Sequence, residues 1–150
     1  MRYFIVIICI LAADQGIKWI VTQNMSQGES NAVIEGILHM TYIRNHGAAF
    51  SFFQGHSQIL GIVTAVFIAG GLVFIYVKRK TGERLMMYSA AMIVGGGAGN
   101  LVDRATMGYV VDYIDFRIFP VFNLADICVT VGCMLLCVSI LKSGGNKTDG

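Results

Sequence analysis

Two long segments of the chain contain no charged residue and consist mostly of apolar side chains. They cover residues 59–77 and 85–102. As helices that rise 1.5 Å per residue, both are roughly 27–29 Å long, which is close to the thickness of the hydrocarbon core of a bilayer. The pattern therefore predicts two transmembrane helices.

Two further segments have the length and apolar character of membrane spans but contain charged residues. Residues 123–141 contain a single charge, Asp126, near their start. Residues 3–21 are interrupted by Asp14 and Lys18. We therefore expect an α-helical polytopic membrane protein with four transmembrane helices, two of which contain ionisable side chains.

The first apolar segment has a second interpretation, as a cleaved signal peptide. Arg2 precedes an apolar run that ends in the small residues Ala12 and Ala13. The apolar character resumes at Ile17, however, and continues to Val21, which favours a retained span.

The segment between the first two spans, about residues 22–57, is not uniformly polar. Residues 32–42 are rich in Val, Ile, Leu and Met and are interrupted by Gly36. Stretches that are β-branched, partly alternating and punctuated by Gly are typical of short strands. We expect a small β-sheet on the outer membrane surface.

Basic residues predict the orientation of the chain. Four spans place seven of them on one side (Arg2, Lys78, Arg79, Lys80, Arg84, Lys142 and Lys147) and four on the other (Lys18, Arg44, Arg104 and Arg117). The richer side is cytoplasmic by the positive-inside rule, so both termini are expected inside and residues 22–57 outside. The spans form a single domain over residues 1–141, and the polar tail 142–150 is expected to be flexible.

Composition agrees with a membrane protein and excludes other classes. Hydrophobic residues make up 55% of the 150 positions and charged residues only 13%, whereas a soluble domain has about a quarter charged. A net charge of +2 without a long basic run excludes nucleic-acid binding. The four Cys lie in apolar segments, so we expect no disulfide, and the three His lack metal-ligand spacing, so we expect no metal site.

Four acidic residues are expected near one membrane face. Helix geometry places Asp103 and Asp126 at the outer ends of the third and fourth spans, about 28 and 24 Å from the basic residues at the inner ends. Asp14 lies deeper, and Asp112 lies in the short connection between these two spans. Ionisable residues in a span usually mark function or a paired interior site.

Two of these acids also have a purely structural interpretation at the ends or within helices. Asn123 and Asp126 have the spacing of a helix N-terminal capping box, which alone accounts for both. Asp14 and Lys18 are four residues apart on one helix and neutralise each other in the simplest interpretation.

The remaining acids have similar alternatives. For Asp103 the structural alternative is a local ion pair with Arg104, which would offset the unfavourable negative charge at a helix C-terminus. Asn100, one turn inside the boundary, needs partners and suggests a polar network with these two residues. Asp112 and Asp115 are compatible with solvated loop acids, and the residues alone do not distinguish between them.

Carboxylates are the catalytic groups that this chain offers. It has no Gly-x-Ser-x-Gly motif, and the serines of its spans have no His partner. Two close carboxylates share a proton, so one can activate water while the other polarises the scissile carbonyl. The start of a helix stabilises an anion, which predicts Asp126 as the ionised partner.

The pattern favours a two-aspartate hydrolytic site, and two other classes compete with it. A small proton- or cation-coupled transporter has intramembrane acids, but its site usually lies near the bilayer midplane. A non-catalytic membrane subunit, assembled through Gly95 and Gly99, leaves the carboxylate cluster unexplained.

Five sequence blocks, in order along residues 1–141, resemble the lipoprotein signal peptidase (signal peptidase II) family. They are Asp14-Gln15 with Lys18, Asn45-His46-Gly47-Ala48-Ala49-Phe50, Gly96-Gly97-Ala98-Gly99-Asn100-Leu101-Val102-Asp103-Arg104, Val110-Val111-Asp112-Tyr113 and Phe122-Asn123-Leu124-Ala125-Asp126. Any one block alone is weak, whereas five in the family's order are highly specific.

The resemblance implies an aspartyl endopeptidase of the bacterial cytoplasmic membrane, without metal or organic cofactor, whose site faces outward. It implies cleavage of prolipoproteins just before the lipid-modified cysteine, with prolipoproteins and membrane lipid as partners. By motif matching, the dyad is Asp112 and Asp126 rather than Asp115. Asp14, Asn45, Asn100, Asp103, Arg104 and Asn123 match positions that line or support the family's site. The expected strands match the family's outer β-cradle, and we expect a monomer.

Overall fold

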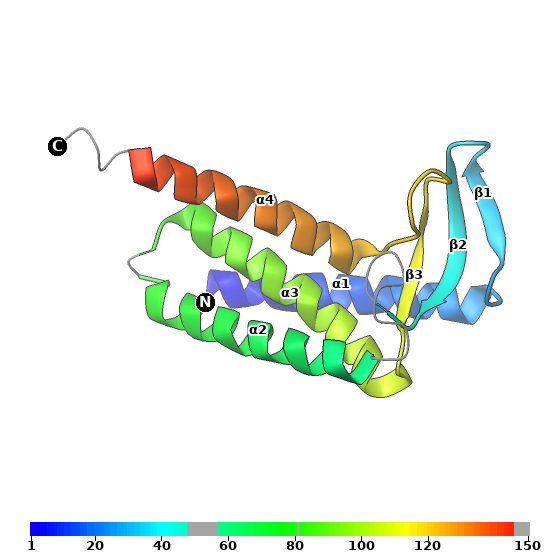
Figure 1. Ribbon diagram of the computed structural model, residues 1–150, viewed down its shortest axis with the longest axis horizontal. Coiled ribbons are helices and arrows are strands. Elements are labelled where there is room, and N and C mark those ends of the chain that lie inside the picture. The colour runs from blue at the N-terminus through cyan, green and yellow to red at the C-terminus, as the bar shows by residue number, and fades with distance from the viewer. Residues whose placement is uncertain (48–56, 81, 146–150) are drawn as a thin grey trace.

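The computed structural model describes residues 1–47, 57–80 and 82–145. Within them, four long helices form a bundle with a small sheet at one end (Figure 1). The helices are α1 (Arg2–Asn24), α2 (Ser57–Lys78), α3 (Arg84–Met107) and α4 (Leu124–Gly145), and the strands are β1 (Ser30–Ile34), β2 (Leu38–Asn45) and β3 (Val110–Asp115). Each helix is long and apolar enough to cross a membrane. The expected fold class is confirmed.

The helix α3 lies in the middle of the bundle and contacts the other three helices. Small residues allow this close packing. A Cβ atom added to Gly95 would lie 3.1 Å from Ile10 of α1, and one added to Gly96 would overlap the carbonyl oxygen of Ala125 in α4. The expected role of Gly95 and Gly99 in close helix packing is confirmed.

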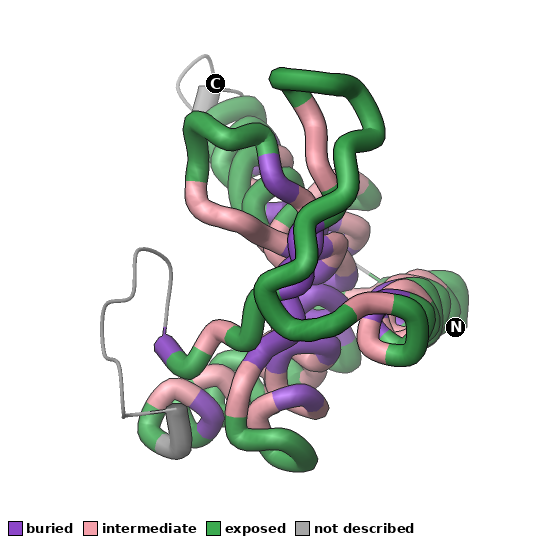
Figure 2. Tube along the Cα trace, turned by 90° about the vertical axis from the view of Figure 1, so that its right-hand side faces the viewer, coloured by how far each residue is buried: buried purple, intermediate pink, exposed green. Residues whose placement is uncertain are grey.

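The sheet is antiparallel in the order β1-β2-β3 and packs on the C-terminal end of α1. Buried Tyr42 of β2 and Val111 and Tyr113 of β3 form a cluster with Val21 of α1. Seen from the sheet end, buried residues run through the middle of the molecule, where the sheet meets the bundle (Figure 2). The strands expected within residues 32–42 are confirmed as β1 and β2.

The third strand differs from the sequence expectation. Asp112 was expected in a loop, but it lies on β3, because the free edge of β2 offers backbone partners to the β-branched run that starts at Val110. Asp112 and Asp115 are only 2% and 6% exposed. The interpretation of these two acids as solvated loop residues is therefore wrong.

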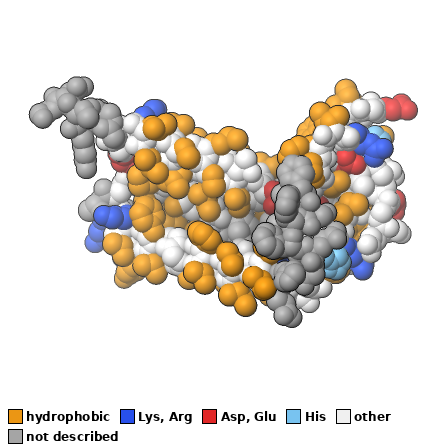
Figure 3. Space-filling model, viewed as in Figure 1, with side chains coloured by type: hydrophobic (Ala, Val, Ile, Leu, Met, Phe, Trp, Pro, Cys, Tyr) orange, Lys and Arg blue, Asp and Glu red, His pale blue; other side chains and the backbone are white. Residues whose placement is uncertain are grey.

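The helix α3 extends beyond its expected span at its C-terminal end. Instead of stopping at residue 102, α3 continues to Met107 and ends at Gly108, whose φ of 77° suits a left-handed C-terminal cap. Apolar side chains cover the helices on the face shown in Figure 3, while charged side chains lie near the two ends of the bundle. Residues 48–56 of the outer segment and 146–150 of the tail lie outside the described residues.

Candidate active site

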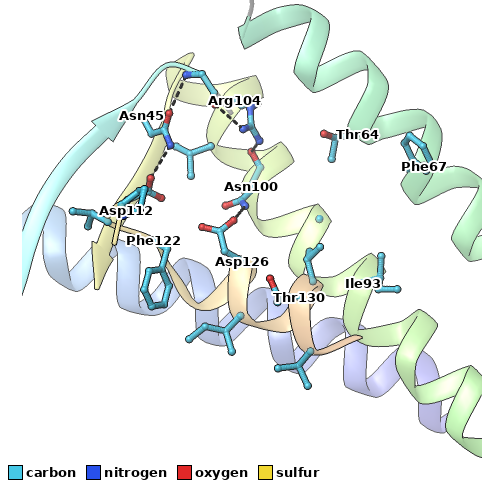
Figure 4. A pocket seen from close by; sticks show the side chains of 18 of the residues that line it. Asn45, Thr64, Phe67, Ile93, Asn100, Arg104, Asp112, Phe122, Asp126 and Thr130 are labelled. Atoms are coloured by element: carbon cyan, nitrogen blue, oxygen red, sulfur yellow. Dashed lines mark hydrogen bonds between the residues drawn. The ribbon is translucent and has the colours of Figure 1, made fainter. Parts of the chain in front are cut away.

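Asp112 and Asp126 line one cavity where the sheet meets the bundle (Figure 4). Asp112 comes from β3 and Asp126 from the first turn of α4. The cavity has a volume of about 760 Å³. Asn45, Asn100 and Arg104 line the same end of it. The structure thus brings together residues that are separated by up to 81 positions in the chain.

Amide groups hold both carboxylates. Asn123 Nδ2 donates to Asp112 Oδ1 at 2.7 Å, and Asn45 Nδ2 donates to Asp112 Oδ2 at 2.9 Å. Asn100 Nδ2 donates to Asp126 Oδ1 at 2.8 Å, and the backbone N–H of Asn123 donates to Asp126 Oδ2 at 3.2 Å. Each carboxylate oxygen therefore accepts one of these hydrogen bonds, and its second lone pair can accept another from water or substrate.

Asn123 and Asp126 form the capping box that their spacing predicted. The backbone N–H of Asp126 donates to Asn123 Oδ1 at 3.0 Å. The backbone N–H of Asn123 donates in return to Asp126 Oδ2, which completes the box. The side chain of Asn123 is buried and also reaches Asp112 through its Nδ2 group. The capping interpretation is thus confirmed, and the same residue also links the two acids of the cavity.

A buried lysine lies behind this site. Lys18 Nζ lies 2.8 Å from both Asp14 Oδ2 and Asp103 Oδ2, and it donates to Asn100 Oδ1 at 2.9 Å. These three partners use all three N–H donors of the ammonium group. Because the oxygen of Asn100 faces Lys18, its NH₂ group is directed toward Asp126.

Lys18 was absent from the expected site residues, and it changes one expected pairing. The Asp14–Lys18 pair is confirmed, but the alternative of an ion pair between Asp103 and Arg104 is wrong. Adjacent residues on a helix point in different directions, so Asp103 faces α1 while Arg104 faces the cavity. The expected network around Asn100 exists, but its side chain contacts Lys18, Asp126 and Asn123 instead.

The two acids bound to Lys18 also connect the elements around them. Asp14 Oδ1 accepts from the backbone N–H of Ala125 at 3.0 Å. Asp103 accepts from Gln15 Nε2 at 2.8 Å and from the backbone N–H of Val111 at 3.1 Å. Because one cation is shared by two buried carboxylates, these additional donors compensate for lost hydration. The network links α1, α3, β3 and α4.

The two acids of β3 have different electrostatic environments. Burial raises the pKa of Asp112 to about 7, and the charge of Asp126 adds to the rise, while hydrogen bonds from Asn45 and Asn123 oppose it. For Asp115, burial also acts to raise the pKa, but hydrogen bonds from Thr41 and Arg117 outweigh it, so its pKa is below the usual value. Asp115 does not line the cavity.

Arg104 presents a guanidinium group to the cavity. Its two terminal nitrogens donate to the carbonyl oxygens of Gly47 at 3.2 Å and Asn100 at 3.4 Å. Its Nε atom is buried and has no hydrogen-bond partner among the described residues.

The rest of the cavity wall is mostly apolar. Side chains of α2, α3, α4 and the segment after β3 form it, including Phe67, Ile93, Phe122 and Val131. The cavity thus has a polar end at the two aspartates and an apolar remainder. Within residues 1–47, 57–80 and 82–145, no group of three or more His, Cys, Asp or Glu side chains is arranged to hold a metal ion.

Comparisons with known proteins agree on one family. A family model described as signal peptidase (SPase) II matches residues 6–142. The chain is 42% identical to the lipoprotein signal peptidase of Halothermothrix orenii over 133 residues, covering 89% of this chain and 90% of the relative. It is 40% identical to that of Listeria monocytogenes, covering 100% and 99%.

Two solved structures have the same fold. A bacterial membrane enzyme solved by the in meso method at 2.3 Å resolution superposes with a TM-score of 0.90 and 31% identity, covering 99% of this chain and 93% of that one. A second bacterial membrane enzyme, solved in the same way at 1.9 Å, gives a TM-score of 0.83 and 32% identity, covering 94% and 93%.

Proposed function

The chain belongs to the signal peptidase II family, and from this premise we propose that it is a membrane aspartyl endopeptidase that removes signal peptides from prolipoproteins. Cleavage takes place just before the diacylglyceryl-modified cysteine, and the catalytic pair is Asp112 and Asp126. One observation carries the proposal. The two carboxyl groups line the same cavity and are joined by the side chain of Asn123, which donates to one and caps the helix of the other.

The proposed mechanism divides the roles between the two acids. With a pKa of about 7, Asp112 holds a proton in a large share of molecules at neutral pH. Asp126 acts as the carboxylate and takes a proton from water, whose oxygen attacks the scissile carbonyl carbon as Asp112 protonates the carbonyl oxygen. When the tetrahedral intermediate collapses, the C–N bond breaks. The proton on Asp126 passes to the leaving nitrogen, and Asp112 recovers its own.

Two cavity residues are proposed to bind the peptide backbone. Arg104 offers its Nε–H to a carbonyl oxygen while its terminal nitrogens remain on Gly47 and Asn100. Asn45, already bonded to Asp112, lies at the end of β2 beside the entering chain. Asp14 and Asp103 act further away: with Lys18 they position Asn100, and through it Asp126.

The shape of the cavity supports an amphiphilic substrate. Its polar end holds the aspartates, and its apolar remainder runs along helices that can cross a membrane. A prolipoprotein has an apolar signal segment and lipid chains that both prefer the bilayer, with a polar cleavage site between them. We propose a monomer in the bacterial cytoplasmic membrane, with cytoplasmic termini and the site at the outer face, as the distribution of basic residues indicates.

The decisive experiment is cleavage of a diacylglyceryl-modified prolipoprotein by the purified protein. We expect the wild type to cut, and Asp112→Asn and Asp126→Asn to fold normally but cut at least about 10³-fold more slowly, since each loses one proton-transfer group. Asp115→Asn is the matched control on the same strand and should retain most activity.

The proposal fails if either dyad variant keeps a near-normal rate. If the folded wild type does not cut this substrate, the protein should next be tested for proton-coupled transport in vesicles.

A further inference from the structure

The first turn of α4 is held by side chains from other elements. The first backbone N–H groups of a helix have no partner within the helix and need acceptors from outside it. The N–H of Leu124 donates to the hydroxyl oxygen of Tyr113 at 3.2 Å, and the N–H of Ala125 donates to Asp14 Oδ1 at 3.0 Å. The third N–H, that of Asp126, is used in the capping box described above. Contacts from β3 and α1 therefore fix the helical turn that carries Asp126.

Tyr113 lies on β3 directly after Asp112. Neighbouring residues of a strand point to opposite faces, so Asp112 lines the cavity while Tyr113 packs on the other face of the sheet. The Tyr113 side chain is 5% exposed and lies in the cluster with Val21 and Tyr42. A ring packed in this way keeps one rotamer, so its hydroxyl group is a fixed acceptor. One strand thus holds one acid of the pair and also a contact to the helix of the other acid.

Backbone pairing returns the chain to β3 just before α4 begins. The N–H of Phe122 donates to the carbonyl oxygen of Ile114 at 3.1 Å, and the N–H of Tyr113 donates to that of Phe122 at 3.0 Å. After this pairing, two groups bind the start of α4 to β3, namely the side-chain amide of Asn123 and the backbone N–H of Leu124. The bond to the Tyr113 hydroxyl group therefore helps to set the direction in which α4 leaves the sheet.

We propose that Tyr113 is a positioning residue for the reaction. By accepting the Leu124 N–H, its hydroxyl group fixes the place of the Asp126 carboxyl group relative to Asp112. The inference rests on the proposed function, because it takes these two acids as the catalytic pair. A displacement of about 1 Å from the reactive geometry can lower a rate by up to about 10²-fold, so one hydrogen bond at this point affects the chemical step.

A hydroxyl group suits this place better than a charged acceptor. Burial raises the pKa of Tyr113 to about 12, so the group stays neutral at any pH at which a carboxyl pair can share a proton. A carboxylate would bind the start of a helix more strongly, but it would add a negative charge beside the two acids. The competing interpretation is that Tyr113 contributes only its ring to the core.

Removal of the hydroxyl group alone distinguishes these interpretations. Tyr113→Phe keeps the ring, and its cleavage of a diacylglyceryl-modified prolipoprotein is compared with that of the wild type. We expect kcat to fall about tenfold. KM should change little, because Asn45 and Arg104, which are proposed to bind the peptide, lie on β2 and α3. An unchanged kcat, or a loss confined to KM, overturns the inference.

Tyr3→Phe is the matched control for a general loss of stability. Tyr3 is 2% exposed, and its hydroxyl group also accepts one N–H, from Arg2 at 3.3 Å, but it lies at the opposite end of α1 from the sheet. Both variants are assayed well below their Tm values. Tyr3→Phe should keep the wild-type kcat even where its Tm falls as much as that of Tyr113→Phe. Equal losses of kcat in the two variants would assign the effect to stability and overturn the inference.

A second substitution removes the donor of the same bond. Leu124 is the first residue of α4, a position that accepts Pro, and Leu124→Pro has no N–H to donate. We expect Tyr113→Phe to lower kcat about tenfold in the protein with Leu124 but less than about twofold in the Leu124→Pro background. The same loss in both backgrounds would show that the effect does not pass through this bond, and it would overturn the inference.

Cleavage by the wild type separates the two proposals. A wild type that does not cut overturns the proposed function and the inference with it. A wild type that cuts, together with a Tyr113→Phe protein of unchanged kcat, overturns the inference alone.

Discussion

The hydrogen bond from Asn45 to Asp112 should determine the upper pH limit of activity. Asn45 Nδ2 lies 2.9 Å from Asp112 Oδ2 and stabilises the ionised form of this acid, whose pKa is about 7. A hydrogen bond to a charged group contributes about 1.5–3 kcal/mol, which corresponds to about one to two pKa units. Asn45→Leu removes the donor but keeps a similar volume, so burial of Asp112 is retained. The pKa of Asp112 should therefore rise to about 8 or 9.

The assay is the pH dependence of kcat/KM between about pH 5 and 10. If Asp112 must hold a proton, wild-type activity is present below about pH 7 and declines above it. Asn45→Leu can lower the maximum, but its decline should begin about one to two pH units higher. Asn31→Leu, in an exposed residue of the same sheet, should keep the wild-type profile. An unchanged upper limit, or a shift to lower pH, would refute the assignment of the proton to Asp112.

Three further substitutions test the framework. Lys18→Met leaves Asp14 without its cation and should lower the free energy of unfolding by about 3–5 kcal/mol, measured by denaturant unfolding in detergent. An unchanged free energy of unfolding would contradict the buried ion network. Gly99→Ala places a Cβ against the Asp14 carboxylate and should lower Tm. Gly97→Ala is the control and should not lower Tm, because its added Cβ would lie 3.5 Å from the nearest atom, in Ile68. Equal Tm values for the two variants would refute this packing. Arg104→Lys should lower kcat/KM about tenfold, because an ammonium group lacks the Nε donor, and full activity would exclude that contact.

The sequence predicted the helices and the positions of Asp103 and Asp126 along them, because both follow from local regularity. A charge-free run of bilayer length is sufficient to indicate a span, and a constant rise per residue places Asp126 near the start of α4. The capping box at Asn123 was also predictable, since its partners are three residues apart. These features depend on distances along one helix and on no tertiary contact.

Contacts between distant segments could not be predicted in this way. The pairing of Asp103 with Lys18 rather than with Arg104 depends on how α1 and α3 are rotated against each other. Gln15 reaches Asp103 across 88 residues, and no spacing rule covers such a distance. The strand β3 exists because β2 offers an edge, so the burial of Asp112 depends on a partner from another part of the chain. Only the resemblance to a family distinguished Asp112 from Asp115 before the structure did.

The partners of the acids support the proposal that Asp112 and Asp126, and not the other acids, are catalytic. Among the described residues, ion pairs involve Asp14, Asp103 and Asp115, and none involves Asp112 or Asp126. A cation in contact with a carboxylate favours its ionised form. A cation between Asp112 and Asp126 would therefore stabilise both of them as carboxylates, and they would no longer share a proton. Lys18 instead binds Asp14 and Asp103, and it contacts the proposed dyad only through the Asn100 amide. Amides position the two proposed catalytic carboxyl groups without supplying a charge, so burial and mutual repulsion still raise the pKa of Asp112 to about 7.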